Sequence, residues 1–168
     1  DVIIGSYAAL NLDTSSTSVI IGHLSAEKSV ISYGNVYIGF RVGHSNNGQD
    51  NVFIGNNAGL SGYTSIDNSI FIGNYAGHKE TSSNTLIIDS IERLNETDGR
   101  NKALLYGKFD SSLSNQFLRI NGKFYVSGLT NGTSTSMVYY DSSTNEFLYG
   151  AITGGDNYWQ KSGSTVYN

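Results

Sequence analysis

The feature that most constrains this chain is an Ile-Gly pair that recurs through its first half. The pair returns five times at spacings of 16 to 18 residues, and a sixth copy carries Asp in the glycine position. The copies are Ile4-Gly5, Ile21-Gly22, Ile38-Gly39, Ile54-Gly55, Ile72-Gly73 and Ile88-Asp89. A period of this length predicts a solenoid, in which each repeat forms one coil and buries its apolar side chains against its neighbours.

Further columns repeat around each pair. A Val, Ile or Leu stands two residues before each Ile, a small polar residue precedes most strands, and Ala or Gly stands four residues after each Gly. We expect the Gly to take positive φ at the end of a strand, and the small polar side chains to bond backbone groups at the turns. Residues two apart share one face of a strand. We therefore predict that the branched residues fill the interior of each coil, including the column Ile4, Ile21, Ile38, Ile54 and Ile72.

The residue between the two branched positions is apolar as well, so the strands lack the alternation of a sheet with one wet face. This middle column consists of Ile3, Ile20, Tyr37, Phe53, Phe71 and Ile87. A strand that is apolar on both sides is covered on both sides, and a coil of about 17 residues is short for that task. We predict that a neighbouring chain provides the cover, with Tyr37, Phe53 and Phe71 at a trimer interface. A monomeric solenoid with exposed aromatic residues is the alternative.

Two copies carry a resemblance to a known family. The segments Asn51-Val-Phe-Ile-Gly-Asn-Asn-Ala-Gly59 and Asn68-Ser-Ile-Phe-Ile-Gly-Asn-Tyr-Ala-Gly77 resemble the head repeats of trimeric, YadA-like autotransporter adhesins. They resemble related repeats of phage tail fibres more closely. The resemblance covers about residues 1–90. It implies a left-handed parallel β-roll, three chains about one axis, and a role in attachment.

The remaining sequence predicts more β structure. We expect a connector at 91–128, with strands at 103–109, 117–120 and 123–127, the last two joined by a hairpin turn at Asn121-Gly122. Its charged segment 91–102 is interpreted as a solvated connection, with a ligand-facing loop as the alternative. In a C-terminal hairpin module at 129–168, Met137–Tyr140 and Glu146–Tyr149 flank a turn, and 158–167 is expected to be a strand. No segment predicts a helix, so the fold class is all-β: a parallel β-roll or β-solenoid at 1–90, then hairpins.

Composition limits the chemistry. The net charge is −4 and no basic stripe is present, so nucleic acid is not an expected partner. No apolar run approaches the roughly 20 residues of a membrane span, and there is no cysteine. The histidines His23, His44 and His78 are expected at the surface, with no metal site and no cofactor. Ile54, Leu60, Ile66 and Ile72 follow the six-residue spacing of acyltransferases with a left-handed β-helix, but the spacing fails outside one coil, so no catalytic residue is assigned.

These observations predict a structural segment of a homotrimeric surface fibre, and not an enzyme. A phage tail fibre on the virion is favoured over a bacterial adhesin head, because the segments after the repeats resemble fibre proteins. An acyltransferase-like trimeric enzyme is the alternative of another class. Expected partners are two further copies, other fibre or baseplate proteins, and a host-surface glycan or protein. The aromatic C-terminal region makes Tyr158 and Trp159 the candidate receptor contacts. We expect the chain to be part of a longer protein.

Overall fold

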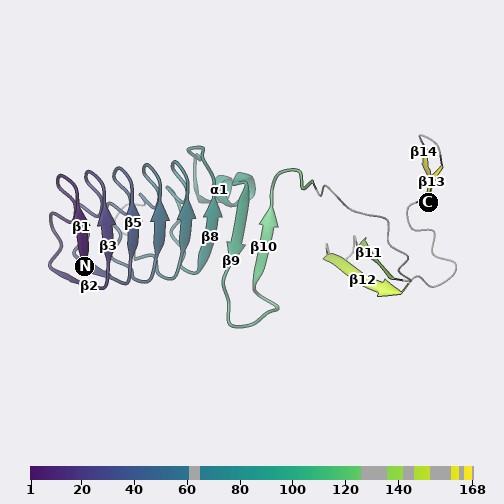
Figure 1. The fold of residues 1–168 in the computed structure, drawn as a ribbon, viewed down its shortest axis with the longest axis horizontal. Coiled ribbons are helices and arrows are strands. Elements are labelled where there is room, and N and C mark those ends of the chain that lie inside the picture. The colour runs from purple at the N-terminus through teal and green to yellow at the C-terminus, as the bar shows by residue number, and fades with distance from the viewer. Residues whose placement is uncertain (61–64, 126–135, 142–145, 152–159, 163–164, 168) are drawn as a thin grey trace. The chain divides into compact units, whose positions relative to one another are not determined.

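The computed structural model describes residues 1–60, 65–125, 136–141, 146–151, 160–162 and 165–167. These residues divide into two compact units, Asp1–Phe124 and Tyr125–Asn168. The first unit is a stack of coils that share one long sheet (Figure 1).

Six parallel strands, one from each repeat, form most of this sheet. They are β1 (Val2–Ile4), β3 (Val19–Ile21), β5 (Val36–Ile38), β6 (Val52–Ile54), β7 (Ile70–Ile72) and β8 (Thr85–Ile88). Equivalent residues pair across coils, as Val36 does with Val52 and Phe53 with Phe71. On another side of the first coils, β2 (Thr14–Ser16) pairs with β4 (Ile31–Tyr33), also in parallel. The predicted parallel β-solenoid is confirmed, with about 5 turns.

The interior of the coils is formed by the middle residue of each strand from β3 onward, whereas Ile3 in the first coil is 46% exposed. Ile20, Tyr37, Phe53 and Phe71 are fully buried within the single chain, together with the small residues that follow each Gly. The prediction that Tyr37, Phe53 and Phe71 face a neighbouring chain is therefore wrong. The prediction that the column beginning at Ile4 lies inside is wrong too, because Ile4 and its equivalents point outward. One coil does cover the aromatic face of its own strand, since its returning segment packs against the rings.

The size of the middle residue matches the residue that faces it. A Cβ on Gly43 would lie 2.7 Å from the ring of Tyr37, and Cβ atoms on Gly59 and Gly77 would overlap the rings of Phe53 and Phe71. The first two coils, with Ile3 and Ile20 in the middle, carry Ala9 and Ala26 at the facing position instead. All these facing residues have positive φ. In the three coils with an aromatic residue, the two columns contact each other.

The glycine of each Ile-Gly pair allows the coils to stack closely. Gly22 has a φ of 136°, and a Cβ there would overlap the carbonyl oxygen of Gly39 in the next coil. The expected positive φ is confirmed.

A ladder of buried polar side chains runs alongside the apolar interior. The backbone N–H of Asn51 donates to Asn35 Oδ1 at 3.0 Å, the N–H of Ser69 donates to Asn51 Oδ1 at 3.0 Å, and the N–H of Thr85 donates to Ser69 Oγ at 3.1 Å. The predicted role of these residues is confirmed, with each side chain serving the next coil.

The sheet continues beyond the repeats with antiparallel strands. β9 (Leu105–Lys108) pairs with β8, and β10 (Phe117–Ile120) pairs with β9. The hairpin predicted around Asn121-Gly122 is wrong, because β10 pairs backward with β9 and residues 123–125 form no strand. In Figure 1 the loop between β9 and β10 projects well past the coils.

One short helix, α1 (Glu96–Lys102), contradicts the expectation of no helix. Asn95 caps it by accepting a hydrogen bond from the Asp98 N–H at 2.9 Å. Arg100 forms a two-pronged ion pair with the buried Glu80 of the last coil, with Nε 3.0 Å from Oε2. Segment 91–102 therefore packs on the roll through its charges and is not only a solvated connection.

The second unit holds two antiparallel pairs. β11 (Ser136–Asp141) pairs with β12 (Glu146–Ala151), which confirms the predicted hairpin, and β13 (Gln160–Ser162) pairs with β14 (Thr165–Tyr167). The single strand expected at 158–167 is thus two strands in the part that is described. Tyr158 and Trp159 lie outside the described residues.

Candidate interaction surface

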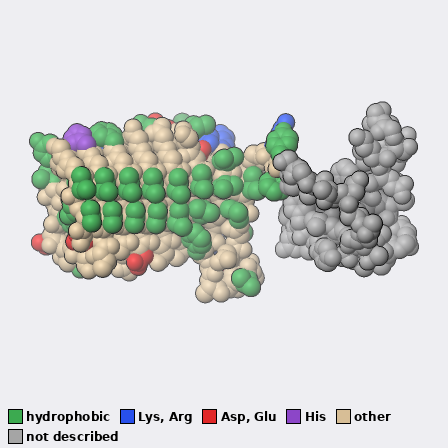
Figure 2. Space-filling model, in the orientation of Figure 1, with side chains coloured by type: hydrophobic (Ala, Val, Ile, Leu, Met, Phe, Trp, Pro, Cys, Tyr) green, Lys and Arg blue, Asp and Glu red, His purple; other side chains and the backbone are tan. Residues whose placement is uncertain are grey.

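The outer face of the solenoid sheet carries two parallel rows of branched apolar side chains. The valine row consists of Val2, Val19, Val36, Val52, Ile70 and Leu86. The isoleucine row consists of Ile4, Ile21, Ile38, Ile54, Ile72 and Ile88. We call these twelve residues the apolar strip. Figure 2 shows them as two continuous green lines along the roll.

None of the twelve side chains is buried in the single chain. Ile4 is 58% exposed in the first coil, Ile38 and Ile72 are each 37% exposed, and most of the others are half-buried between their neighbours. Six strands at about 4.8 Å spacing make the strip about 25 Å long, and two side chains make it about 10 Å wide. Exposed apolar surface that is contiguous and organised in this way marks an interaction site on a soluble protein.

The strip has no ionisable group and no polar side chain. A partner that fits it offers apolar side chains, since a sugar or a charged peptide would lose hydrogen bonds to water without finding replacements. The rows are straight and regular because every strand pairs in register with the next. Such a surface is complementary to another straight apolar row.

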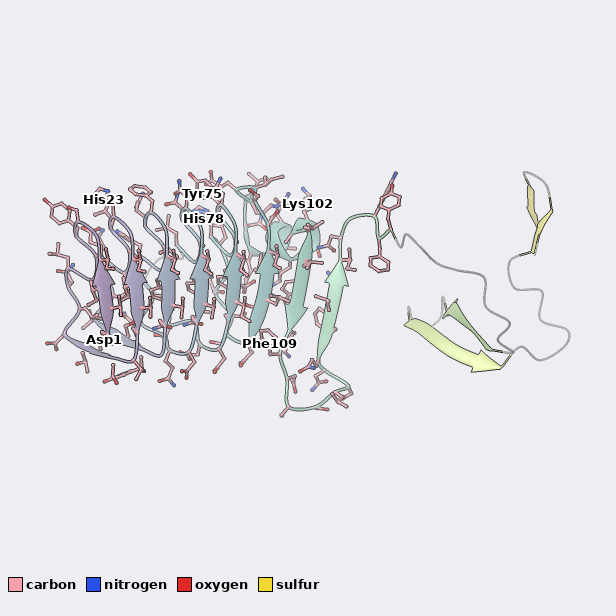
Figure 3. The ribbon with its side chains drawn as sticks, viewed as in Figure 1. Asp1, His23, Tyr75, His78, Lys102 and Phe109 are labelled. Atoms are coloured by element: carbon pink, nitrogen blue, oxygen red, sulfur yellow. The ribbon has the colours of Figure 1, made fainter. Side chains whose placement is uncertain are left out.

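A second group of exposed apolar side chains lies on the turn next to the strip. The rings of Tyr7 and His23 have centroids 6.0 Å apart, and those of His23 and Phe40 lie 5.6 Å apart. His23 and Tyr75 are labelled along this edge in Figure 3. The rings of successive coils contact one another, which accounts for their alignment without a ligand.

The histidines have three different environments. His23 is exposed, as predicted, whereas His44 is buried and His78 is half-buried with Nδ1 3.6 Å from Glu92. His44 Nε2 lies 2.7 Å from Oε2 of Glu27, the residue at the equivalent position of the neighbouring coil. Burial lowers the pKa of His44 against the opposing effect of Glu27, and burial also lowers the pKa of His78.

The contact of His44 Nδ1 with Ser45 Oγ, at 3.0 Å, completes a Ser-His-Glu chain. Ser45 is itself buried, so its hydroxyl is not presented to a substrate. Among the described residues no three His, Asp or Glu side chains gather as a metal site. The enclosed cavity beside α1, lined by residues such as His78 and Glu96, has a volume of about 10 Å³, room for one water molecule.

The six-residue spacing noted in the sequence does not correspond to one environment. Ile66 is fully buried, Ile72 is 37% exposed, and Leu60 is half-buried. In a hexapeptide β-helix equivalent residues would all point into the coil, so these four residues do not form such a turn.

Sequence reasoning found every residue of the strip but assigned the strip to the interior of the coils.

Comparisons of the chain with models of protein families, with curated proteins and with solved structures each gave no match. In the described part of the chain, α1 is far too short and polar to cross a membrane.

Proposed function

We propose that this chain is a structural segment of a homotrimeric surface fibre, in which three solenoids place their apolar strips around a common axis. The observation that carries the proposal is the strip itself: two uninterrupted rows of exposed or half-buried Val, Ile and Leu along the whole stack of coils. Around a three-fold axis, the valine row of each copy meets the isoleucine row of the next, which closes the ring.

The resemblance of segments 51–59 and 68–77 to fibre and adhesin repeats supports three copies and a role in attachment. We favour a phage tail fibre on the virion, contacting other fibre or baseplate proteins and a host-surface receptor. Mechanically, such a rod spaces and orients a binding tip and presents each weak contact three times. Tyr158 and Trp159 stay predictions for receptor contact.

The experiment is a mass measurement by sedimentation and light scattering on the full chain at micromolar concentration. We expect three times the chain mass of 18.1 kDa. Ile54→Asp is expected to yield a folded single chain, because this half-buried side chain belongs to the strip and not to the interior. Three carboxylates around one axis repel each other and lose hydration, so association weakens by several kcal/mol per trimer.

Asn56→Asp is the matched control, since it adds the same charge two residues away on an exposed turn. A wild-type mass of one or two chains would overturn the proposal. A trimer that tolerates Ile54→Asp as well as Asn56→Asp would remove the strip from the interface.

A further inference from the structure

The two rows of the apolar strip do not stop with the repeats. Ile88 is in register with Leu105 of β9, which is in register with Ile120 of β10. Leu86 is in register with Gly107, and Gly107 with Leu118. The antiparallel strands therefore continue both rows by two further steps, although their sequences do not belong to the repeat.

β10 has no buried residue in the single chain. Leu118 is 59% exposed and Ile120 is 39% exposed, and both lie on the face that carries the strip. On the opposite face of β10, the Arg119 guanidinium lies 5.8 Å from the centroid of the Tyr106 ring, and Phe117 is 42% exposed. The outward face of this strand is apolar and lacks a cover in the single chain.

Gly107 makes a gap in the valine row. Its φ does not lie in the left-handed region, so the backbone conformation does not require glycine. The gap is part of a groove of about 410 Å³, lined by Leu86, Gly107, Lys108, Phe109, Gln116, Phe117 and Leu118. A methyl group at Gly107 would contact Leu86 and Leu118 at 3.4 and 3.6 Å and the Phe117 carbonyl oxygen at 3.0 Å. Gly107 itself is buried by these neighbours in the single chain, so the room for a side chain from outside is that of the groove they line.

We infer that a second copy of this chain covers β9 and β10, aligned parallel and in register, and that its Leu105 enters the gap at Gly107. The inference rests on the proposed three-fold assembly and extends it to a segment outside the repeats. In a parallel, in-register assembly, the same strand of each copy lies at the same level along the axis. Leu105 and Gly107 both belong to β9, so they lie at one level. The residue facing the gap is then Leu105 of the neighbouring copy, as Ile88 of that copy faces Leu86 one level earlier, on β8.

The second copy is the occupant that the surface favours. The added positions are Leu or Ile apart from the gap, so they match the uncharged rows with which they are continuous. The strip of the repeats alone covers about 25 by 10 Å in projection. This area is small compared with the roughly 800 Å² of surface that each partner buries in an interface of standard size. Two more strands lengthen the strip by about a third.

The alignment is tested by cross-linking, for which the absence of cysteine from the chain is an advantage. Ile21→Cys, Ile54→Cys and Ile120→Cys are made singly in the full chain and treated with a short bis-maleimide. A parallel, in-register assembly cross-links copies at all three positions. An antiparallel one separates like residues at the ends by more than 15 Å and cross-links only near the middle, at Ile54→Cys, which would overturn the inference while leaving an oligomer.

The contribution of β10 is tested by Leu118→Asp, with Leu113→Asp as control. Leu113 is 84% exposed in the loop between β9 and β10, outside both rows. We expect Leu118→Asp to weaken association by about 100-fold or more and Leu113→Asp to leave it within about twofold. Equal effects of the two would overturn the inference.

The gap is tested by Gly107→Leu alone and combined with Leu105→Gly. The single variant is expected to weaken association at least tenfold and the double variant to recover most of the loss, because the large and small residues are exchanged. A double variant no better than the single one would refute the contact. A monomeric wild-type chain or an antiparallel cross-linking pattern would overturn the proposed function and this inference together. The outcomes for Leu118→Asp and for the gap concern the inference alone.

Discussion

The match between Phe53 and Gly59 leads to a quantitative prediction about the interior of the roll. In Gly59→Ala the new methyl group overlaps the Phe53 ring, and the residue keeps a φ of 61°. The left-handed conformation costs about 1 kcal/mol for alanine, and overpacking adds about 1–3 kcal/mol. We expect the free energy of unfolding to fall by about 2–4 kcal/mol.

Phe53→Ile removes a ring that lies 5.2 Å from Tyr37 and 4.5 Å from Phe71, centroid to centroid. Loss of the two stacked pairs and of side-chain volume should cost about 2–3 kcal/mol. In the double variant, Ile and Ala recreate the natural pair of Ile20 and Ala26. Gly59→Ala should then cost only its backbone contribution of about 1 kcal/mol, which gives a favourable coupling of about 1–3 kcal/mol.

The assay is urea unfolding of the four proteins at one fixed chain concentration, because association adds to apparent stability. Gly55→Ala is the control, since its Cβ would overlap the Gly73 carbonyl oxygen and not a side chain. Gly55→Ala should lower the free energy of unfolding by the same amount whether position 53 holds Phe or Ile. If Gly59→Ala costs the same in both backgrounds, within about 0.5 kcal/mol, the facing pair is not the reason for the glycine.

Three further predictions concern buried polar groups. Asn51→Ala should lower the free energy of unfolding by about 3 kcal/mol, because the Ser69 N–H and the Ile66 carbonyl lose their partner; exposed Asn56→Ala should change it by less than about 0.5 kcal/mol. Glu80→Ala should cost about 2–3 kcal/mol and increase hydrogen exchange in α1, since Arg100 loses its buried partner; unchanged exchange would contradict this. His44 has a folded pKa below 6.5, so stability should fall as pH drops below about 6.5, and less steeply in His44→Gln; identical pH profiles would contradict it.

The coil stack was predictable because the repeat fixes which residues pair. The six parallel strands of the long sheet follow from aligning the Ile-Gly pairs, and their observed register equals that alignment. The pair β2 and β4 was not predicted. The inside and outside of the strand were not predictable from alternation, since all three positions are apolar. A usable signal was present nevertheless: the aromatic residues occur where the facing column has Gly, and Ile3 and Ile20 occur where it has Ala. Two columns of residues whose side-chain sizes vary together in this way are in contact.

The end of the roll was harder to predict for two reasons. The helix α1 has only seven residues and no apolar face, so periodicity gives no signal. Its caps do: Asn95 precedes the helix, Glu96 and Asp98 lie in its first turn, and Lys102 lies in its last. The strand β10 was located correctly but given the wrong partner, because a near turn at Asn121-Gly122 was favoured over the longer loop back to β9.

The two faces of the strand have the opposite roles to those predicted, but one apolar face still lacks a cover in the single chain. The strands are apolar on both sides, and each coil has chain enough to cover one side. The side of the strand that carries the aromatic residues is covered by the chain itself. Its side chains differ in size, and each needs a facing residue of matching size, as Phe53 has in Gly59. The side left over holds only Val, Ile and Leu in straight rows. That regularity suits contact with the strip of a second copy, since every level of one copy then meets the same level of the next. The side that a neighbouring chain can cover is thus the more uniform one, and Tyr37, Phe53 and Phe71 are excluded from it by the same matching that buries them.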